Sequence, residues 1–200
     1  PVTLTERVRQ AQLGPDLCHR QPEYVELQRE VRRRLGQVYA EASQQYSPVL
    51  VTGSGTAAVE CMVDSLARED GKTLVVANGI YGERIAAILK AHRKPYEIIA
   101  SEWTQPIDLQ AVEQRLSDGS GVTHVVTVHH ETTTGRLNQV GALGELCRRY
   151  DVPLLLDAVS SFGGEPLQFD EWNLQACAAT ANKCLHGVPG TAFVLARRDI

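Results

Sequence analysis

Short apolar runs alternate with amphipathic stretches along most of the chain. The runs indicate strands that are buried on both faces, and the stretches between them carry apolar residues at helical spacing. We expect strands at 48–52, 73–77, 96–100, 123–128, 153–156, 176–180 and 191–196, and helices that begin at Thr56, Tyr81, Leu109 and Val140. This alternation predicts an α/β fold, a three-layer αβα domain around a mostly parallel sheet.

A helix is expected ahead of this alternation. Between Pro22 and Ser43 the sequence is charged, and its apolar residues from Val25 to Val38 approximate helical spacing. We interpret this stretch as a surface helix that leads into the sheet. Neither a repeat nor a linker divides the sequence, so residues 1–200 are expected to form one large domain. The chain begins at Pro1 and stops directly after a strand, which we interpret as a piece of a longer protein.

Composition narrows the class of protein. The 200 residues are 43% hydrophobic, and 20 basic and 24 acidic residues give a net charge of −4. The charges are dispersed apart from Arg32, Arg33 and Arg34, which does not favour a nucleic-acid partner. Because no apolar run approaches the roughly 20 residues that span a bilayer, we expect no membrane association and a soluble, cytoplasmic protein. The five cysteines lack C-x-x-C spacing and are expected to be reduced thiols.

A glycine-rich turn follows the strand that ends at Thr52. In Gly53-Ser54-Gly55-Thr56 the glycines let the backbone approach an anion, and the next helix points its first N–H groups at it. Ser54, Gly55 and Thr56 are therefore candidates to bind a phosphate group. The alternative is an ordinary strand-to-helix turn with a serine or threonine cap. The turn matches neither the dinucleotide fingerprint nor the P-loop.

Two later strands end beside titratable residues. Asp157 follows the apolar strand at 153–156, where a carboxylate can pair with the protonated pyridine nitrogen of pyridoxal phosphate (PLP). Lys183 follows the strand at 176–180, where partial desolvation can favour the neutral amine that attacks an aldehyde. Taken alone, Asp157 could be a structural acid and Lys183 a surface charge.

Two further strand ends offer polar or aromatic side chains. Tyr81 stands between Gly79 and Gly82 and could stack on a flat cofactor ring, or simply pack at a helix start. The run at 129–135, His-His-Glu-Thr-Thr-Thr-Gly, has hydroxyls that could bond the phenolic oxygen of PLP, and Glu131 could fix the loop. Its two histidines point to opposite faces of a strand and lack a third ligand, so no metal site is expected.

Taken in order, these motifs resemble the fold-type I, class V aminotransferases, and within them the 2-aminoethylphosphonate:pyruvate branch. The resemblance covers essentially the whole chain. It rests on Gly53-Ser54-Gly55-Thr56, Asn78-Gly79-Ile80-Tyr81-Gly82-Glu83-Arg84, His130-Glu131-Thr132-Thr133-Thr134-Gly135, Asp157-Ala158-Val159-Ser160-Ser161-Phe162-Gly163-Gly164 and Ala181-Asn182-Lys183-Cys184-Leu185-His186-Gly187-Val188-Pro189-Gly190. The Glu-Thr-Thr-Thr-Gly and Asn-Lys-Cys runs favour the phosphonate branch over the alanine:glyoxylate branch, which tends to Glu-Ser-Ser-Thr-Gly and Gln-Lys.

The resemblance assigns a role to each candidate residue. It implies that Lys183 carries the PLP aldehyde as a Schiff base and that Asp157 faces the pyridine nitrogen. The remaining cofactor contacts are Ser54, Gly55, Thr56 and Asn182 at the phosphate, Tyr81 on the ring and Thr132 at the ring hydroxyl.

The resemblance also implies a reaction and an assembly. The expected reaction moves the amino group of 2-aminoethylphosphonate to pyruvate, with a related class V aminotransferase or an aminophosphonate lyase as alternatives. A non-catalytic nucleotide-binding domain is a further alternative. The family builds its active sites between the subunits of a homodimer. Its small C-terminal domain, which supplies an arginine for the substrate's acid group, is absent from this sequence.

Overall fold

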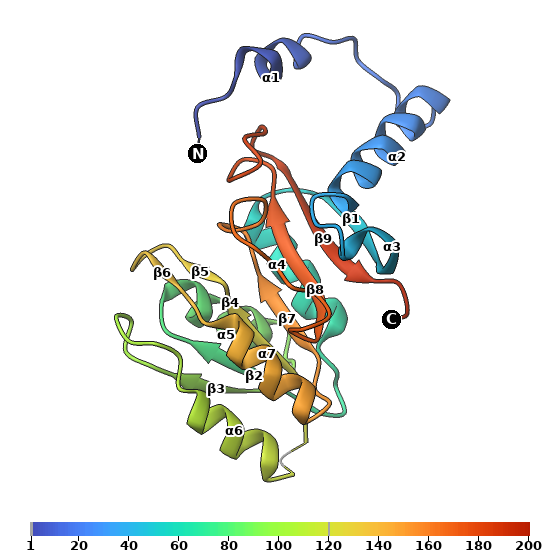
Figure 1. Cartoon of the computed structure of the whole chain (residues 1–200). Coiled ribbons are helices and arrows are strands. Elements are labelled where there is room, and N and C mark those ends of the chain that lie inside the picture. Colours follow the sequence, from blue (N-terminus) through green and yellow to red (C-terminus); the bar gives the residue numbers. More distant parts are fainter. Residues whose placement is uncertain (1, 120) are drawn as a thin grey trace.

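Helices and strands alternate along most of the chain, as the sequence predicts (Figure 1). The computed structural model describes residues 2–119 and 121–200. In chain order the elements are α1 (Glu6–Ala11), α2 (Pro22–Gly36), α3 (Ala42–Gln45), β1 (Tyr46–Thr52), α4 (Gly55–Leu66), β2 (Lys72–Ala77), α5 (Ile80–Ala91), β3 (Tyr96–Ala100), α6 (Leu109–Ser117), β4 (Val122–Val128), β5 (His130–Glu131), β6 (Arg136–Leu137), α7 (Val140–Arg149), β7 (Leu154–Asp157), β8 (Leu174–Thr180) and β9 (Thr191–Arg197).

One seven-stranded sheet forms the centre of the molecule, in the order β1-β9-β8-β7-β4-β2-β3. The pairs from β8 through β7, β4 and β2 to β3 are parallel, which confirms the mostly parallel sheet. β9 runs antiparallel to both β8 and β1. The carboxyl ends of β1, β2, β3, β4, β7 and β8 therefore share one edge of the sheet, and β9 begins there.

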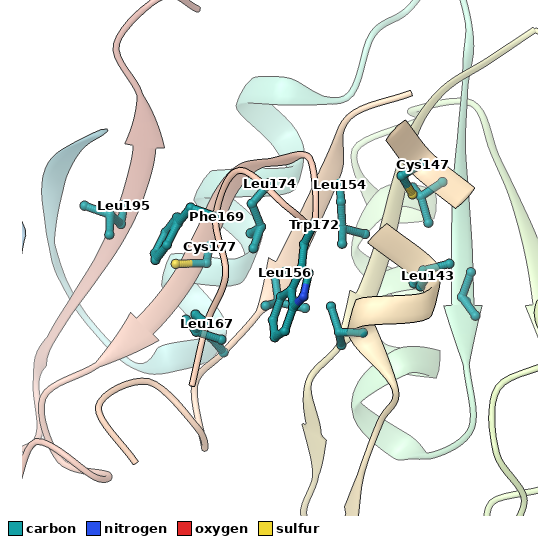
Figure 2. Packing of buried hydrophobic residues seen from close by; sticks show 14 of the residues in the cluster. Leu143, Cys147, Leu154, Leu156, Leu167, Phe169, Trp172, Leu174, Cys177 and Leu195 are labelled. Carbon is teal, nitrogen blue, oxygen red and sulfur yellow. The ribbon is translucent and has the colours of Figure 1, made fainter. Parts of the chain in front are cut away.

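Helices cover both faces of this sheet, so the predicted three layers are present. On one face, α4 and α5 pack on alternate strand residues such as Val126 and Leu155. On the other face, α6 and α7 pack with Val125, Leu154 and Leu156. Figure 2 shows this second core, where side chains of α7, β7, β8 and β9 gather with Trp172 and Phe169.

The two-residue period of β7 decides where Asp157 points. Leu154 and Leu156 belong to the core beneath α7, whereas Leu155 belongs to the core beneath α4 and α5. Side chains alternate along a strand, so Asp157 points to the same face as Leu155. The carboxylate is thereby directed towards the N-terminal ends of α4 and α5.

The first part of the chain departs from the sequence-based expectation. A single helix was expected from Pro22 to Ser43, but α2 ends at Gly36 and a short α3 follows. Glycine is a poor helix former, and the chain turns after Gly36 to reach β1. In Figure 1, α1 and α2 (blue) extend away from the sheet, and α1 buries none of its residues.

Candidate active site

Asp157 is a buried acid at the carboxyl edge of the sheet. The residue is 6% exposed, and its Oδ1 accepts a hydrogen bond of 2.9 Å from the N–H of Val159. Burial raises the pKa of Asp157 to about 6, and the negative charge of Glu131 adds to this, while the Val159 bond and the charge of Arg84 oppose it. A positively charged partner would stabilise this carboxylate.

Asp157 lines a pocket with two other residues that the sequence singled out. Thr56 from the first turn of α4 and Tyr81 from the first turn of α5 form part of the same wall. The full lining is Thr56, Val59, Tyr81, Arg84, Ile85, Ile88, Asp157 and Val159. A hydroxyl, an aromatic ring and a carboxylate from three separate segments thus line one small, largely apolar hollow of about 20 Å³.

The glycine turn before α4 borders this pocket. Ser54 is the N-cap of α4, and its hydroxyl accepts a hydrogen bond of 3.2 Å from the N–H of Ala57, as the capping interpretation requires. Gly55 is buried, and a Cβ there would lie 2.7 Å from Cγ1 of Val159. This close approach places the start of α4 directly against the loop that follows Asp157. The capping role and a phosphate-binding role for the remaining N–H groups are compatible.

Glu131 holds the start of α5. Its buried carboxylate accepts hydrogen bonds from the N–H groups of Tyr81 and Gly82 and from the hydroxyl of Thr133. Gly79 makes room for it, because a Cβ at Gly79 would lie 2.2 Å from Cγ of Glu131. The expectation that Glu131 fixes a loop therefore has a specific form, since this carboxylate fixes the backbone that carries Tyr81.

Lys183 lies half-buried on the turn between β8 and β9. This turn is anchored to the site on two sides. Cys184 donates from Sγ to the carbonyl of Ser160, in the loop after Asp157, at 3.4 Å, and the carbonyl of Gly190 accepts a hydrogen bond of 2.9 Å from the N–H of Gly53. The lysine turn is consequently in contact with both the Asp157 loop and the glycine turn.

The other predicted contacts lie around the pocket rather than in its wall. Asn182 is half-buried beside Lys183, and its Oδ1 accepts a hydrogen bond of 2.8 Å from the hydroxyl of Thr180. Thr132 is exposed in the turn of the β5–β6 hairpin, next to Glu131. The structure brings Thr56, Tyr81 and Asp157 together in one pocket wall. The cofactor contacts proposed for all the candidate residues stay predictions: Ser54, Gly55, Thr56, Tyr81, Thr132, Asp157, Asn182 and Lys183.

A metal centre is not built by the part of the chain described here. Among residues 2–119 and 121–200, no group of three or more His, Cys, Asp or Glu side chains could hold a metal ion. His129 is buried and pairs through Nδ1 with the hydroxyl of Ser161 at 2.9 Å, and burial lowers the pKa of His129 to about 4.

In this same part of the chain, no helix is long and apolar enough to cross a membrane.

Sequence reasoning gave no role to three groups that support the site. Arg84 lies over the ring of Tyr81, with Cζ 4.7 Å from the ring centre. Asn78, directly after β2, and Asn138, directly after β6, are 60 positions apart in the chain and exchange amide hydrogen bonds of 2.8 and 3.1 Å. The third is the bond between His129 and the Asp157 loop. The asparagine pair and the bond of His129 join segments that are far apart in the sequence, so no local pattern predicts them. The contact between Arg84 and Tyr81 has the spacing of neighbours on one helix face and could have been predicted from α5.

Two curated proteins illustrate the similarity of this chain to known sequences. The chain is 40% identical over 201 residues to a 2-aminoethylphosphonate–pyruvate transaminase of Klebsiella pneumoniae, covering 98% of this chain and 53% of that protein. It is 37% identical over 199 residues to a bifunctional phosphonoacetaldehyde hydrolase/aminoethylphosphonate transaminase of Clostridioides difficile, covering 100% of this chain and 31% of that protein. The chain thus spans about half, or less, of the length of these relatives.

Solved structures and a family model extend the comparison. An alanine–glyoxylate aminotransferase of Nostoc sp. superposes with a TM-score of 0.89 at 27% identity, over 99% of this chain and 52% of that one. A pyridoxamine–pyruvate aminotransferase of Mesorhizobium loti gives 0.89 at 26% identity, over 100% of this chain and 50% of that one. The model of the aminotransferase class-V family matches residues 11–200. This chain belongs to the class-V aminotransferase family, whose members use PLP.

Proposed function

We propose that this chain is the cofactor-binding large domain of a PLP-dependent aminotransferase that moves the amino group of 2-aminoethylphosphonate to pyruvate. The products are phosphonoacetaldehyde and alanine. The observation that carries the proposal is the buried carboxylate of Asp157, which shares a pocket with Tyr81 and Thr56 and has the Lys183 turn beside it. The resemblance further implies a homodimer, which light scattering on the full-length protein would test.

The described residues fit the chemistry of PLP. Asp157 is an acid in a desolvated position, and a pyridinium nitrogen would supply the positive charge that it lacks there. Tyr81 offers an aromatic face in the same pocket, and α4 begins at its border with N–H groups that suit a phosphate. A carboxylate, a ring and an anion site are thus arranged around one space.

Each residue then has a task in the reaction. Bound PLP supplies an aldehyde that accepts the amino group and a ring that withdraws electrons from the reacting carbon. Asp157 keeps the ring nitrogen protonated, and Tyr81 holds the ring in place. The Nζ amine of Lys183 would take a proton from the substrate carbon that bears the amino group and, as an acid, deliver it to the carbon that was the aldehyde carbon of the cofactor. Ser54, Gly55, Thr56 and Asn182 hold the phosphate, and Thr132 contacts the ring hydroxyl.

The proposed donor is favoured by the relatives in sequence. Proteins named as 2-aminoethylphosphonate–pyruvate transaminases are 35–40% identical to this chain over nearly all of its length. The alternative is transfer from alanine to glyoxylate, the reaction for which the Nostoc enzyme is named. The TM-score of 0.89 with that enzyme supports the shared fold, and the pyridoxamine–pyruvate enzyme gives the same value, so the score does not select a donor. That enzyme is 27% identical, so we place it second.

An absorbance spectrum of the full-length protein with PLP tests the proposal. The band of the bound aldehyde form should bleach with 2-aminoethylphosphonate and return with pyruvate. A band that bleaches with alanine and returns with glyoxylate, but ignores the phosphonate, would instead select the second candidate.

Lys183→Ala should abolish transamination, because it removes the amine that moves the proton. Lys90→Ala on α5, an exposed lysine of the same charge, is the matched control and should keep full activity. Substantial turnover by Lys183→Ala without an added amine would contradict the role assigned to this residue.

A further inference from the structure

Arg84 contacts two separate parts of the site. It lies on α5 three positions after Tyr81, so both side chains stand on one face of that helix. Its Cζ is 4.7 Å from the centre of the Tyr81 ring, and its Nη1 donates a hydrogen bond of 3.3 Å to Oγ1 of Thr56 on α4. A single guanidinium therefore touches both the aromatic residue and the hydroxyl residue of the pocket.

Resting on the proposed function, we infer that Arg84 is a positioning residue that couples the ring-holding Tyr81 to the phosphate-binding turn through Thr56. Its own side chain is exposed. The two residues that it joins come from different helices, and the three together with Asp157 line one pocket. Arg84 thus sets the spacing between the wall that holds the ring and the turn that holds the phosphate.

The chemistry of arginine suits this task. The guanidinium is planar, so it can lie over an aromatic ring while its N–H groups donate in the plane to a neighbour. A lysine ammonium can make either contact but has no flat face to stack. The positive charge of Arg84 also lowers the pKa of Asp157, against the larger effect of burial, and so supports the ionised carboxylate.

A different account would treat Arg84 as an ordinary surface residue. Exposed ion pairs and single surface contacts add little to stability, and losing one changes few properties. Such a residue, when replaced, would leave the affinity for PLP unchanged. A general effect on folding would weaken the binding of every ligand to the same extent. The coupling that we infer predicts neither result.

The test compares PLP with pyridoxal, which lacks the phosphate group, by equilibrium titration of the full-length apoprotein. Arg84→Met should lower the affinity for PLP about tenfold, since it loses a cation–π contact and a hydrogen bond. Its affinity for pyridoxal should fall about threefold or less, because only the ring contact applies. Lys90→Met removes a cation from the same helix and should change neither affinity.

A double-mutant cycle with Thr56→Val sharpens the test. The loss in Arg84→Met/Thr56→Val should be smaller than the product of the two single losses, because both changes remove the same contact. If Arg84→Met does not fold, Arg84→Gln, which keeps part of the side chain, should likewise lose more affinity for PLP than for pyridoxal. Unchanged PLP affinity, or equal losses for the two ligands, would overturn the role of Arg84. Wild-type protein that binds neither ligand would instead overturn the proposed function.

Discussion

Two buried carboxylates lie at neighbouring strand ends of this protein, and their surroundings differ. Glu131 accepts hydrogen bonds from two backbone N–H groups and one hydroxyl. Asp157 accepts one from the N–H of Val159, and burial raises its pKa to about 6. The comparison teaches that burial alone does not identify a functional acid. The hydrogen bonds of Glu131 stabilise the backbone around it. Asp157 has fewer such bonds, so a cationic ligand would stabilise its carboxylate.

The largest expected difference is in catalysis. Asp157→Asn should lower the transamination rate of the full-length protein by at least about 100-fold, because an amide cannot keep the ring nitrogen protonated. Glu131→Gln should cost less than about tenfold, since its effect reaches the cofactor through the position of Tyr81. Steady-state rates with 2-aminoethylphosphonate and pyruvate measure both. Equal losses would remove the distinction between the two acids.

The second expected difference is in stability, where the loss of Glu131 should cost more than the loss of Asp157. Glu131→Ala leaves the N–H groups of Tyr81 and Gly82 without their acceptor, so the apoprotein should lose about 3 kcal/mol of unfolding free energy. Asp157→Asn should leave the apoprotein at least as stable as the wild type at pH 8, because it removes a buried charge. Urea denaturation of the apoproteins compares them. A wild-type value for Glu131→Ala would show that the helix start needs no carboxylate.

The smallest expected effect is a dependence on pH. Asp157 binds its proton more tightly in the folded state, where its pKa is about 6, than in the unfolded state, where it is 3.8. Its contribution to stability is therefore present at low pH and is lost as the pH rises through the folded pKa. Between pH 5 and pH 8 the wild-type apoprotein should lose about 1 kcal/mol relative to Asp157→Asn.

Denaturation midpoints of the two apoproteins at both pH values give this difference directly. Asp151→Asn, at an exposed acid just before β7, is a matched control and should follow the wild-type curve. A wild-type protein that gains stability over Asp157→Asn as the pH rises would contradict the raised pKa.

Much of the fold follows from local sequence. The apolar runs predict the strands of the large sheet, and the stretches between them predict α4, α5, α6 and α7. The direction of β9 could not be predicted, because a short apolar run does not show whether the strand pairs in parallel or antiparallel with its neighbours. The two-residue strands of the β5–β6 hairpin are too short to show an alternating pattern.

The sequence likewise predicts some residues of the candidate site but not the contacts that hold them. Asp157, Tyr81 and Thr56 were predicted as candidates because each lies at the end of a strand or a few residues after it, and parallel strands bring such positions to one edge. The bonds of Arg84 to Thr56, of Asn78 to Asn138 and of His129 to Ser161 could not be predicted, because they join segments that are far apart in the sequence. Sequence position predicts which side chains reach the site, whereas tertiary packing decides what holds them there.

The reversed direction of β9 also bears on the order of folding. Its ladder with β8 joins residues as close in sequence as Thr180 and Ala192, whereas β1 and β9 pair residues as distant as Tyr46 and Arg197. Closing a short loop costs less chain entropy than closing a long one, so local pairings can form earlier. Lys183 lies inside this short hairpin. The hairpin that carries Lys183, the amine proposed to react, can therefore form before the longer connections bring Asp157 and the glycine turn into place around it.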